Sequence, residues 1–230
     1  MRAMKSWVRL RAAKALILGL GAAGFVLVSA SPASATSLAC PASTVLIHGC
    51  VWTNVTASAQ NATIIPAGNP DAQFNTAAIN YNSSVGGFTF AGFLNNPVFT
   101  DTSAGWNPNA QLGDSFYMFT GQMFLNAGNN SFVLGHDDSA VLNVTGIGTV
   151  LSVPGPTAFV NSPFNVVAPS AGLYSFTLQY GECCGAPAAL LFTVNGAPIG
   201  NSAVPEPATF VLLGTGLAVA IARARQIRKS

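Results

Sequence analysis

Alternating apolar and polar residues predict β-strands in the second half of this chain. The clearest stretch is residues 174–180, where Tyr174, Phe176, Leu178 and Tyr180 take every second position and Ser, Thr and Gln lie between them. A period of two is typical of a strand with one face buried and the other exposed. This stretch therefore predicts one strand of a sheet that packs on a core.

Further apolar runs of strand length flank this stretch, separated by Gly, Pro and Asn. They occupy residues 116–119, 122–125, 131–135, 139–144 and 190–194, the last of them ending at the turn pair Asn195-Gly196. Residues 51–109 alternate only weakly, and we expect short strands and long loops there. Many short strands without a helical period predict an all-β protein with an antiparallel β-sandwich that is jelly-roll-like.

The N-terminus has the pattern of a secretory signal peptide. A basic start is followed by an apolar stretch at residues 15–30, and Ala33-Ser34-Ala35 gives the small-x-small pattern of a cleavage site. We expect residues 1–35 to form a signal helix that the secretion machinery recognises, and residues 36–203 to form the exported domain. A permanent N-terminal anchor is the alternative.

The C-terminus combines a Pro-Glu-Pro triplet, a short apolar run and a basic tail. Val204, Pro205, Glu206 and Pro207 precede the apolar run at residues 209–222, which ends in an Arg-rich segment. Fifteen residues, 208–222, would make a helix of only about 22 Å, which is short for a bilayer. The basic end would stay in the cytoplasm. An ordinary short anchor would need no such triplet.

This combination resembles the PEP-CTERM sorting signal of Gram-negative bacteria, over residues 204–230. The resemblance implies that an exosortase-type membrane protease removes the tail after transient anchoring by a transmembrane helix. The protein would then reach the cell surface or the extracellular matrix.

The charge of the exported segment excludes nucleic acid as a partner. All nine Lys and Arg lie at or before residue 14 or at or after residue 223. Residues 36–203 carry six acidic residues and no Lys or Arg. Binding of nucleic acid requires a basic face that neutralises phosphates.

Two adjacent carboxylates, Asp137 and Asp138, interrupt the apolar runs at residues 131–144. Neighbouring anions repel unless a cation or hydrogen-bond donors compensate them, and this segment offers no basic side chain. A hard divalent cation with oxygen ligands, most simply Ca²⁺, would compensate the pair. The alternative is a polar turn in which Asp accepts backbone hydrogen bonds.

The order of these pieces resembles the protective-antigen-type (PA14) and GLEYA adhesin β-sandwich. Residues 135–142 look like its first loop and the strand that follows, and in that loop two aspartates joined by a cis peptide chelate Ca²⁺. Residues 171–180 look like a later strand. The resemblance implies that the following loop, residues 181–186, supplies Glu182 as a further metal ligand. We place His136, Cys183 and Cys184 at the ligand-binding surface.

Four cysteines allow three pairings, and the sequence does not decide among them. Cys40 and Cys50 are ten residues apart, and in an exported chain we favour a disulfide between them. Cys183 and Cys184 are adjacent, and a vicinal disulfide there would form a rigid apolar knob that could pack against a ligand. The alternative is that each of them pairs with Cys40 or Cys50.

No enzymatic activity is expected. Only His48 and His136 could serve as a base, and no Gly-x-Ser-x-Gly motif accompanies them. The favoured hypothesis is a Ca²⁺-dependent surface protein that binds carbohydrate or exopolysaccharide, or that acts in adhesion. A structural matrix protein without a small ligand is the alternative, and an exported glycan hydrolase comes third.

Overall fold

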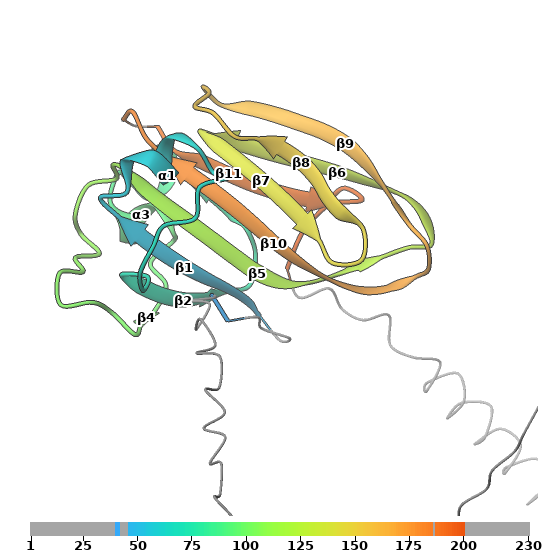
Figure 1. The fold of residues 1–230 in the computed structure, drawn as a ribbon, viewed down its shortest axis with the longest axis horizontal. Helices are drawn as coiled ribbons and strands as arrows, with labels where there is room; N and C mark the ends of the chain where they lie inside the picture. Colours follow the sequence, from blue (N-terminus) through green and yellow to red (C-terminus); the bar gives the residue numbers. More distant parts are fainter. Residues whose placement is uncertain (1–39, 42–45, 186, 201–230) are drawn as a thin grey trace, which may run out of the picture. The chain divides into compact units, whose positions relative to one another are not determined.

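The computed structural model describes residues 40–41, 46–185 and 187–200. The predicted signal helix and C-terminal hydrophobic helix lie outside these residues. Within the described ranges, no helix is both long and apolar enough to cross a membrane. The described strands form two antiparallel sheets that pack face to face, which confirms the predicted β-sandwich (Figure 1).

The larger sheet has seven strands, and the site described below lies at one of its ends. Its strands, in spatial order, are β4 (Phe99–Thr100), β2 (Ala72–Thr76), β1 (Ile47–Thr53), β5 (Ser115–Leu125), β10 (Gly172–Glu182), β7 (Ser139–Val144) and β8 (Gly148–Val153).

The smaller sheet has five strands. Four of them lie in the order β12 (Ala197–Pro198), β11 (Ala189–Val194), β6 (Gly128–Asp137) and β9 (Val160–Ala168), and β3 (Asn80–Asn82) also pairs with β11.

The alternation at residues 174–180 follows the boundary between core and surface. Phe176, Leu178 and Tyr180 are buried in the main core, and Tyr174 packs against its edge. The residue type at every second position therefore sets which face of β10 points between the sheets. Aromatic pairs link the two sheets across this core, for example Phe176 with Phe192 at 6.0 Å between ring centroids.

Three single-turn helices lie in the region for which only short strands and loops were expected. They are α1 (Thr56–Gln60), α2 (Ser83–Gly86) and α3 (Phe90–Phe93). All four residues of α3 are buried, and the side chain of Thr89 caps its N-terminus by accepting a hydrogen bond from the Gly92 N–H at 3.1 Å. Helices of four or five residues are too short to show a helical period, so the sequence pattern did not reveal them.

The turn predicted at Asn195-Gly196 joins β11 to β12. Both residues have positive φ, 52° and 79°, which is the backbone geometry of a two-residue type I′ hairpin. The register pairs Val194 with Ala197 directly across this turn.

Candidate metal and ligand site

Asp137 and Asp138 lie where the chain passes from one sheet to the other. Asp137 ends β6 in the smaller sheet, and Ser139 begins β7 in the larger sheet. The peptide bond between the two aspartates is cis, as the resemblance implied. The register pairs Ser139 with Gly181, so the end of β10 lies beside the aspartate pair.

Backbone N–H groups from two other loops hold the carboxylates in place. Asp138 accepts hydrogen bonds from Thr157 N at Oδ1 (3.2 Å) and from Cys183 N at Oδ2 (2.9 Å). The carboxylate of Asp137 accepts one from the backbone of Phe159. Each carboxylate has about four lone-pair sites, so both keep free acceptor capacity.

The aspartate pair is buried, and no basic side chain among the described residues neutralises its charge. Asp137 is 8% exposed and Asp138 is 6% exposed. Burial raises the pKa of Asp137, and the neighbouring charge of Asp138 raises it further. Burial also raises the pKa of Asp138, against the effect of its two N–H donors. Two buried anions with free lone pairs form an arrangement that a bound cation would stabilise.

The side chain of His136 contacts the backbone of Asp138. This side chain is fully buried, with Nδ1 2.6 Å from the Asp138 carbonyl oxygen and Nε2 3.1 Å from Ser162 Oγ. Because a carbonyl can only accept, Nδ1 carries the proton and Nε2 accepts from the serine hydroxyl. Burial lowers the pKa of His136, which favours this neutral form. The side chain predicted at the ligand-binding surface therefore positions the backbone of Asp138.

Glu182, the predicted third ligand, lies in a buried network with Tyr180. Its side chain is 1% exposed, and Oε2 is 2.7 Å from the Tyr180 hydroxyl, which also contacts the Asp137 carbonyl oxygen. A phenol has one proton to donate. If Tyr180 donates it to the Asp137 carbonyl, the contact with Glu182 requires the proton on the carboxyl group.

The electrostatics of Glu182 agree with this protonated form. Burial raises the pKa of Glu182 to about 9. The Tyr180 hydroxyl opposes this increase in pKa, and the charges of Asp138 and Asp137 reinforce it. The ligand atoms of the three predicted metal residues also do not form one group. Within the described part of the chain, the groups whose potential ligand atoms all lie within 4.8 Å are Cys40–His48–Cys50 and Asp138–Cys183–Cys184.

Cys183 and Cys184 form a vicinal disulfide beside Asp138. Cys183 is buried, whereas Cys184 is exposed and has a positive φ of 66°. Disulfide sulfurs have no thiolate to offer to a metal, so the ligands available in this group are carboxylate oxygens. The disulfide presents an apolar surface next to the acidic pair.

Phe159 lies beside Asp137, and the sequence pattern gave no reason to expect it there. Its side chain is 47% exposed, while its backbone N–H reaches the Asp137 carboxylate. The ring covers Gly135 of β6 so closely that a Cβ atom there would lie 3.2 Å from it. Phe159 reaches this position because it belongs to the loop between β8 and β9.

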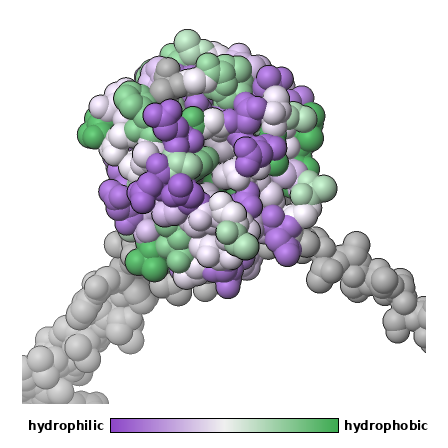
Figure 2. All heavy atoms as spheres, turned by 90° about the vertical axis from the view of Figure 1, so that its left-hand side faces the viewer, coloured by the Kyte–Doolittle hydropathy of each residue, from purple (hydrophilic) through white to green (hydrophobic). Residues whose placement is uncertain are grey.

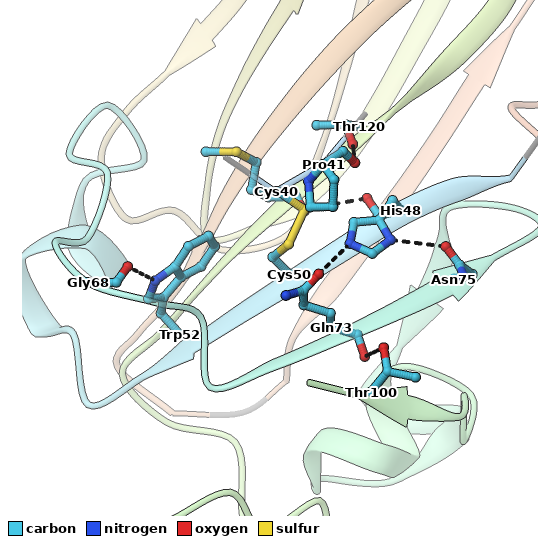
Figure 3. The surroundings of a disulfide bond; sticks show 11 residues. Cys40, Pro41, His48, Cys50, Trp52, Gly68, Gln73, Asn75, Thr100 and Thr120 are labelled. Carbon is cyan, nitrogen blue, oxygen red and sulfur yellow. Dashed lines mark hydrogen bonds between the residues drawn. A yellow bond between two sulfur atoms is a disulfide. The ribbon is translucent and has the colours of Figure 1, made fainter. Parts of the chain in front are cut away.

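The second cysteine pair, Cys40 and Cys50, is also a disulfide, shown in Figure 3. The ring of His48 lies near it, with Nδ1 3.0 Å from Asn75 Oδ1 and Nε2 3.0 Å from Gln73 Oε1. Both ring nitrogens therefore have amide partners and both sulfurs are oxidised. This group has a structural role rather than that of a metal site.

Comparison with known proteins identifies a sorting motif in the chain and solved structures of similar fold. The PEP-CTERM protein-sorting motif matches residues 203–226, in agreement with the sequence analysis. No curated protein sequence matches the chain.

Two solved structures share the fold at low identity. The PA14 domain of MpAFP antifreeze protein has a TM-score of 0.53 and 16% identity, and the match covers 71% of this chain and 90% of that domain. The PA14 sugar-binding domain from an RTX adhesin has a TM-score of 0.50 and 21% identity, covering 68% of this chain and 94% of that domain. The chain thus joins a β-sandwich of the PA14 fold to a PEP-CTERM protein-sorting motif.

Proposed function

We propose that this protein is an exported carbohydrate-binding protein of the cell surface or extracellular matrix, and that Asp137 and Asp138 hold the Ca²⁺ through which it binds sugar. The observation that carries the proposal is the pair of adjacent, buried carboxylates, for which the segment offers no basic partner. The PA14 fold supports it, because one protein of similar structure is described as a sugar-binding domain.

The donor set fits a hard cation. Ca²⁺ takes six to eight oxygen ligands in a flexible geometry, and carboxylates are its commonest protein ligands. The N–H donors on Asp138 fix its orientation and leave lone pairs on both oxygens. A bound Ca²⁺ would supply the positive charge that attracts sugar hydroxyls. Glu182, buried and bonded to Tyr180, would act as a positioning residue for the Asp137 backbone.

The apolar surfaces beside the two aspartates suit the carbon face of a sugar ring. Phe159 lies beside Asp137, and the Cys183–Cys184 disulfide lies beside Asp138. Binding sites for small molecules commonly combine a few fixed polar groups with apolar and aromatic walls. In the proposed site, the carboxylates orient the hydroxyls and these walls contact the C–H groups.

The sorting motif supports a location outside the cytoplasm. A PEP-CTERM motif at residues 203–226 implies export and transient anchoring by the C-terminal region. An exosortase-type protease would then be a processing partner, and an extracellular polysaccharide would be the carbohydrate within reach.

Calorimetric titration of the full-length protein with sugars tests the proposal. We use glucose, galactose, mannose and fucose, each in added Ca²⁺ and in chelator. Binding of at least one sugar in Ca²⁺, and its loss in chelator, is the expected result. Binding of none of them, nor of oligosaccharides built from them, would favour a structural matrix protein.

Replacing Phe159 with alanine is expected to weaken sugar binding about tenfold, which corresponds to about 1.4 kcal/mol. The substitution removes one apolar wall but leaves the backbone N–H that contacts Asp137. Stabilisation by Ca²⁺ should therefore stay unchanged. Leu173→Ala is the matched control, because Leu173 is similarly exposed (49%) but lies at the opposite end of β10. Equal affinities in both variants would exclude Phe159 from the binding site.

A further inference from the structure

A pocket lies in the same domain, and neither Asp137 nor Asp138 lines it. Its volume is about 160 Å³, and its lining includes Thr53, Asn54, Phe90, Trp106, Gln111 and Asp114. A single water needs only about 10–15 Å³ by this measure, so the pocket is much larger than a site for one water. The pocket is therefore suited to a ligand the size of one small ring.

The pocket opens at the end of the sandwich that carries the acidic pair. Thr53 ends β1, and Asp114 directly precedes β5, whose first residue, Ser115, pairs with both Thr53 and Glu182. From β1 the sheet continues through β5 and β10 to β7. Three steps of about 4.8 Å between strands give a separation of about 14 Å from Asp138.

This end of the domain faces the viewer in Figure 2. Hydrophilic side chains gather across its middle, and the more hydrophobic residues lie mainly towards its edge. Strand pairing places the pocket and the acidic pair at this same end of the sandwich.

One wall of the pocket is an indole ring that presents carbon to it. Trp106 packs against Phe90 at 5.3 Å and against Phe99 at 4.9 Å between ring centroids. Its Nε1 atom is buried and has no hydrogen-bond partner among the described residues. A phenylalanine would avoid that unpaired donor, so packing alone does not account for a tryptophan here.

Several other lining residues are polar, and none of the lining residues is basic. Asn54 and Gln111 are exposed amides, and the carboxylate of Asp114 accepts a hydrogen bond from Thr56 Oγ1 at 2.5 Å. The pocket thus offers donors, acceptors and an aromatic surface, but only a negative charge. An acidic ligand would be repelled, and a neutral polyhydroxyl ligand would be accommodated.

We propose that this pocket is a second carbohydrate subsite, which takes one neutral sugar unit of the same oligosaccharide that is bound at Asp137 and Asp138. The proposal rests on the proposed function, and it adds that the protein recognises a glycan chain rather than a single sugar. Trp106 stacks on the apolar face of that unit, while Asn54, Gln111 and Asp114 bind its hydroxyls.

Enlarging a residue of the pocket lining tests the proposal. Gly105 lines the pocket, and a Cβ atom there would meet nothing within 4 Å, so Gly105→Leu places a side chain in open space. Gly172→Leu is the matched control, because Gly172 is equally open but begins β10 at the other end of the sheet. Both full-length variants are titrated with the four monosaccharides above and with di-, tri- and tetrasaccharides built from them.

We expect Gly105→Leu to weaken oligosaccharide binding about tenfold, to the level of the corresponding monosaccharide. Monosaccharide affinity and the response to Ca²⁺ should not change, and Gly172→Leu should match the wild type. Unchanged oligosaccharide affinity in Gly105→Leu would overturn the subsite and leave the proposed function intact. Failure of every sugar to bind the wild type would overturn both.

A second variant covers the case in which Gly105→Leu fails to fold. Gln111→Ala removes an exposed side chain of the pocket and should show the same selective loss of oligosaccharide affinity. Full retention of oligosaccharide affinity in that variant would count against the subsite.

Discussion

Addition of Ca²⁺ is expected to raise the melting temperature of the full-length protein, and Asp137→Asn is expected to abolish the increase. A ligand that binds only the native state at 100 times its Kd stabilises it by about 2.7 kcal/mol. For a domain of this size, each kcal/mol corresponds to roughly 2–4 °C. The expected increase is therefore about 5–10 °C, measured by thermal unfolding in Ca²⁺ and in chelator.

The same substitution should have no destabilising effect in chelator. Asparagine has the shape of aspartate and can still accept the hydrogen bond from Phe159, but it removes one of two buried like charges. Because burial and the neighbouring charge both raise the pKa of Asp137, the ionised pair costs stability when no cation is bound. The variant should then be at least as stable as the wild type in chelator and less stable in Ca²⁺.

An exposed carboxylate provides the control for charge alone. Asp101 is exposed and lies at a positive φ of 47°, a conformation that asparagine also tolerates. Asp101→Asn should therefore respond to Ca²⁺ as the wild type does. A full Ca²⁺ response in Asp137→Asn would place the ion elsewhere, and a wild type that ignores both Ca²⁺ and chelator would remove the metal from the proposal.

The sandwich could be predicted because each sheet buries one face. The alternation at residues 174–180 reports which side chains of β10 enter the core, and the structure buries Phe176, Leu178 and Tyr180 as expected. The helices α1 to α3 could not be predicted in the same way. Each makes about one turn, and α3 is held by a Thr89 cap and by burial of its own residues, which depend on contacts distant in sequence.

The acidic pair was recognisable from the sequence because its unusual feature is local: two adjacent aspartates in a segment without basic residues. The residues that surround the pair could not be recognised from the sequence. Thr157 and Phe159 reach the pair from the loop between β8 and β9, and the pairing of Ser139 with Gly181 brings Cys183 to Asp138. These contacts follow from strand order and register, which a single sequence does not specify.

Glu182→Gln is expected to stabilise the protein at alkaline pH, with a benefit that shrinks towards acidic pH. The carboxyl of Glu182 has its pKa raised from 4.5 to about 9 in the native state, first of all by burial. Between these values the native state holds a proton that the unfolded chain has lost, so stability declines as pH rises through this window. The decline is at most about 1.4 kcal/mol per pH unit.

Glutamine removes this dependence because it does not titrate. Its amide N–H can donate to the Tyr180 hydroxyl as the protonated carboxyl does, so the network to the Asp137 carbonyl persists. The difference in free energy of unfolding between variant and wild type should be smallest at pH 5 and grow by up to about 4 kcal/mol at pH 8. Urea unfolding in calcium-free buffer at a series of pH values measures it.

The contributions of the other titrating groups to the free energy of unfolding cancel in this difference. The pKa of His136 is lowered by burial, so its contribution to stability is lost as pH falls below its ordinary value, opposite in sign to that of Glu182. It is present in both proteins, as are Asp137 and Asp138. Asp101→Asn again serves as the control for an exposed carboxylate.

The same variant separates the two roles that Glu182 could have in the metal site. A positioning residue acts through Tyr180, so Glu182→Gln should keep the Ca²⁺-induced rise in melting temperature almost in full. A metal ligand, as the sequence predicted, would lose most of that rise together with its negative charge. A pH profile parallel to the wild type would show that Glu182 is ionised in the native state, with Tyr180 donating to it rather than to the Asp137 carbonyl.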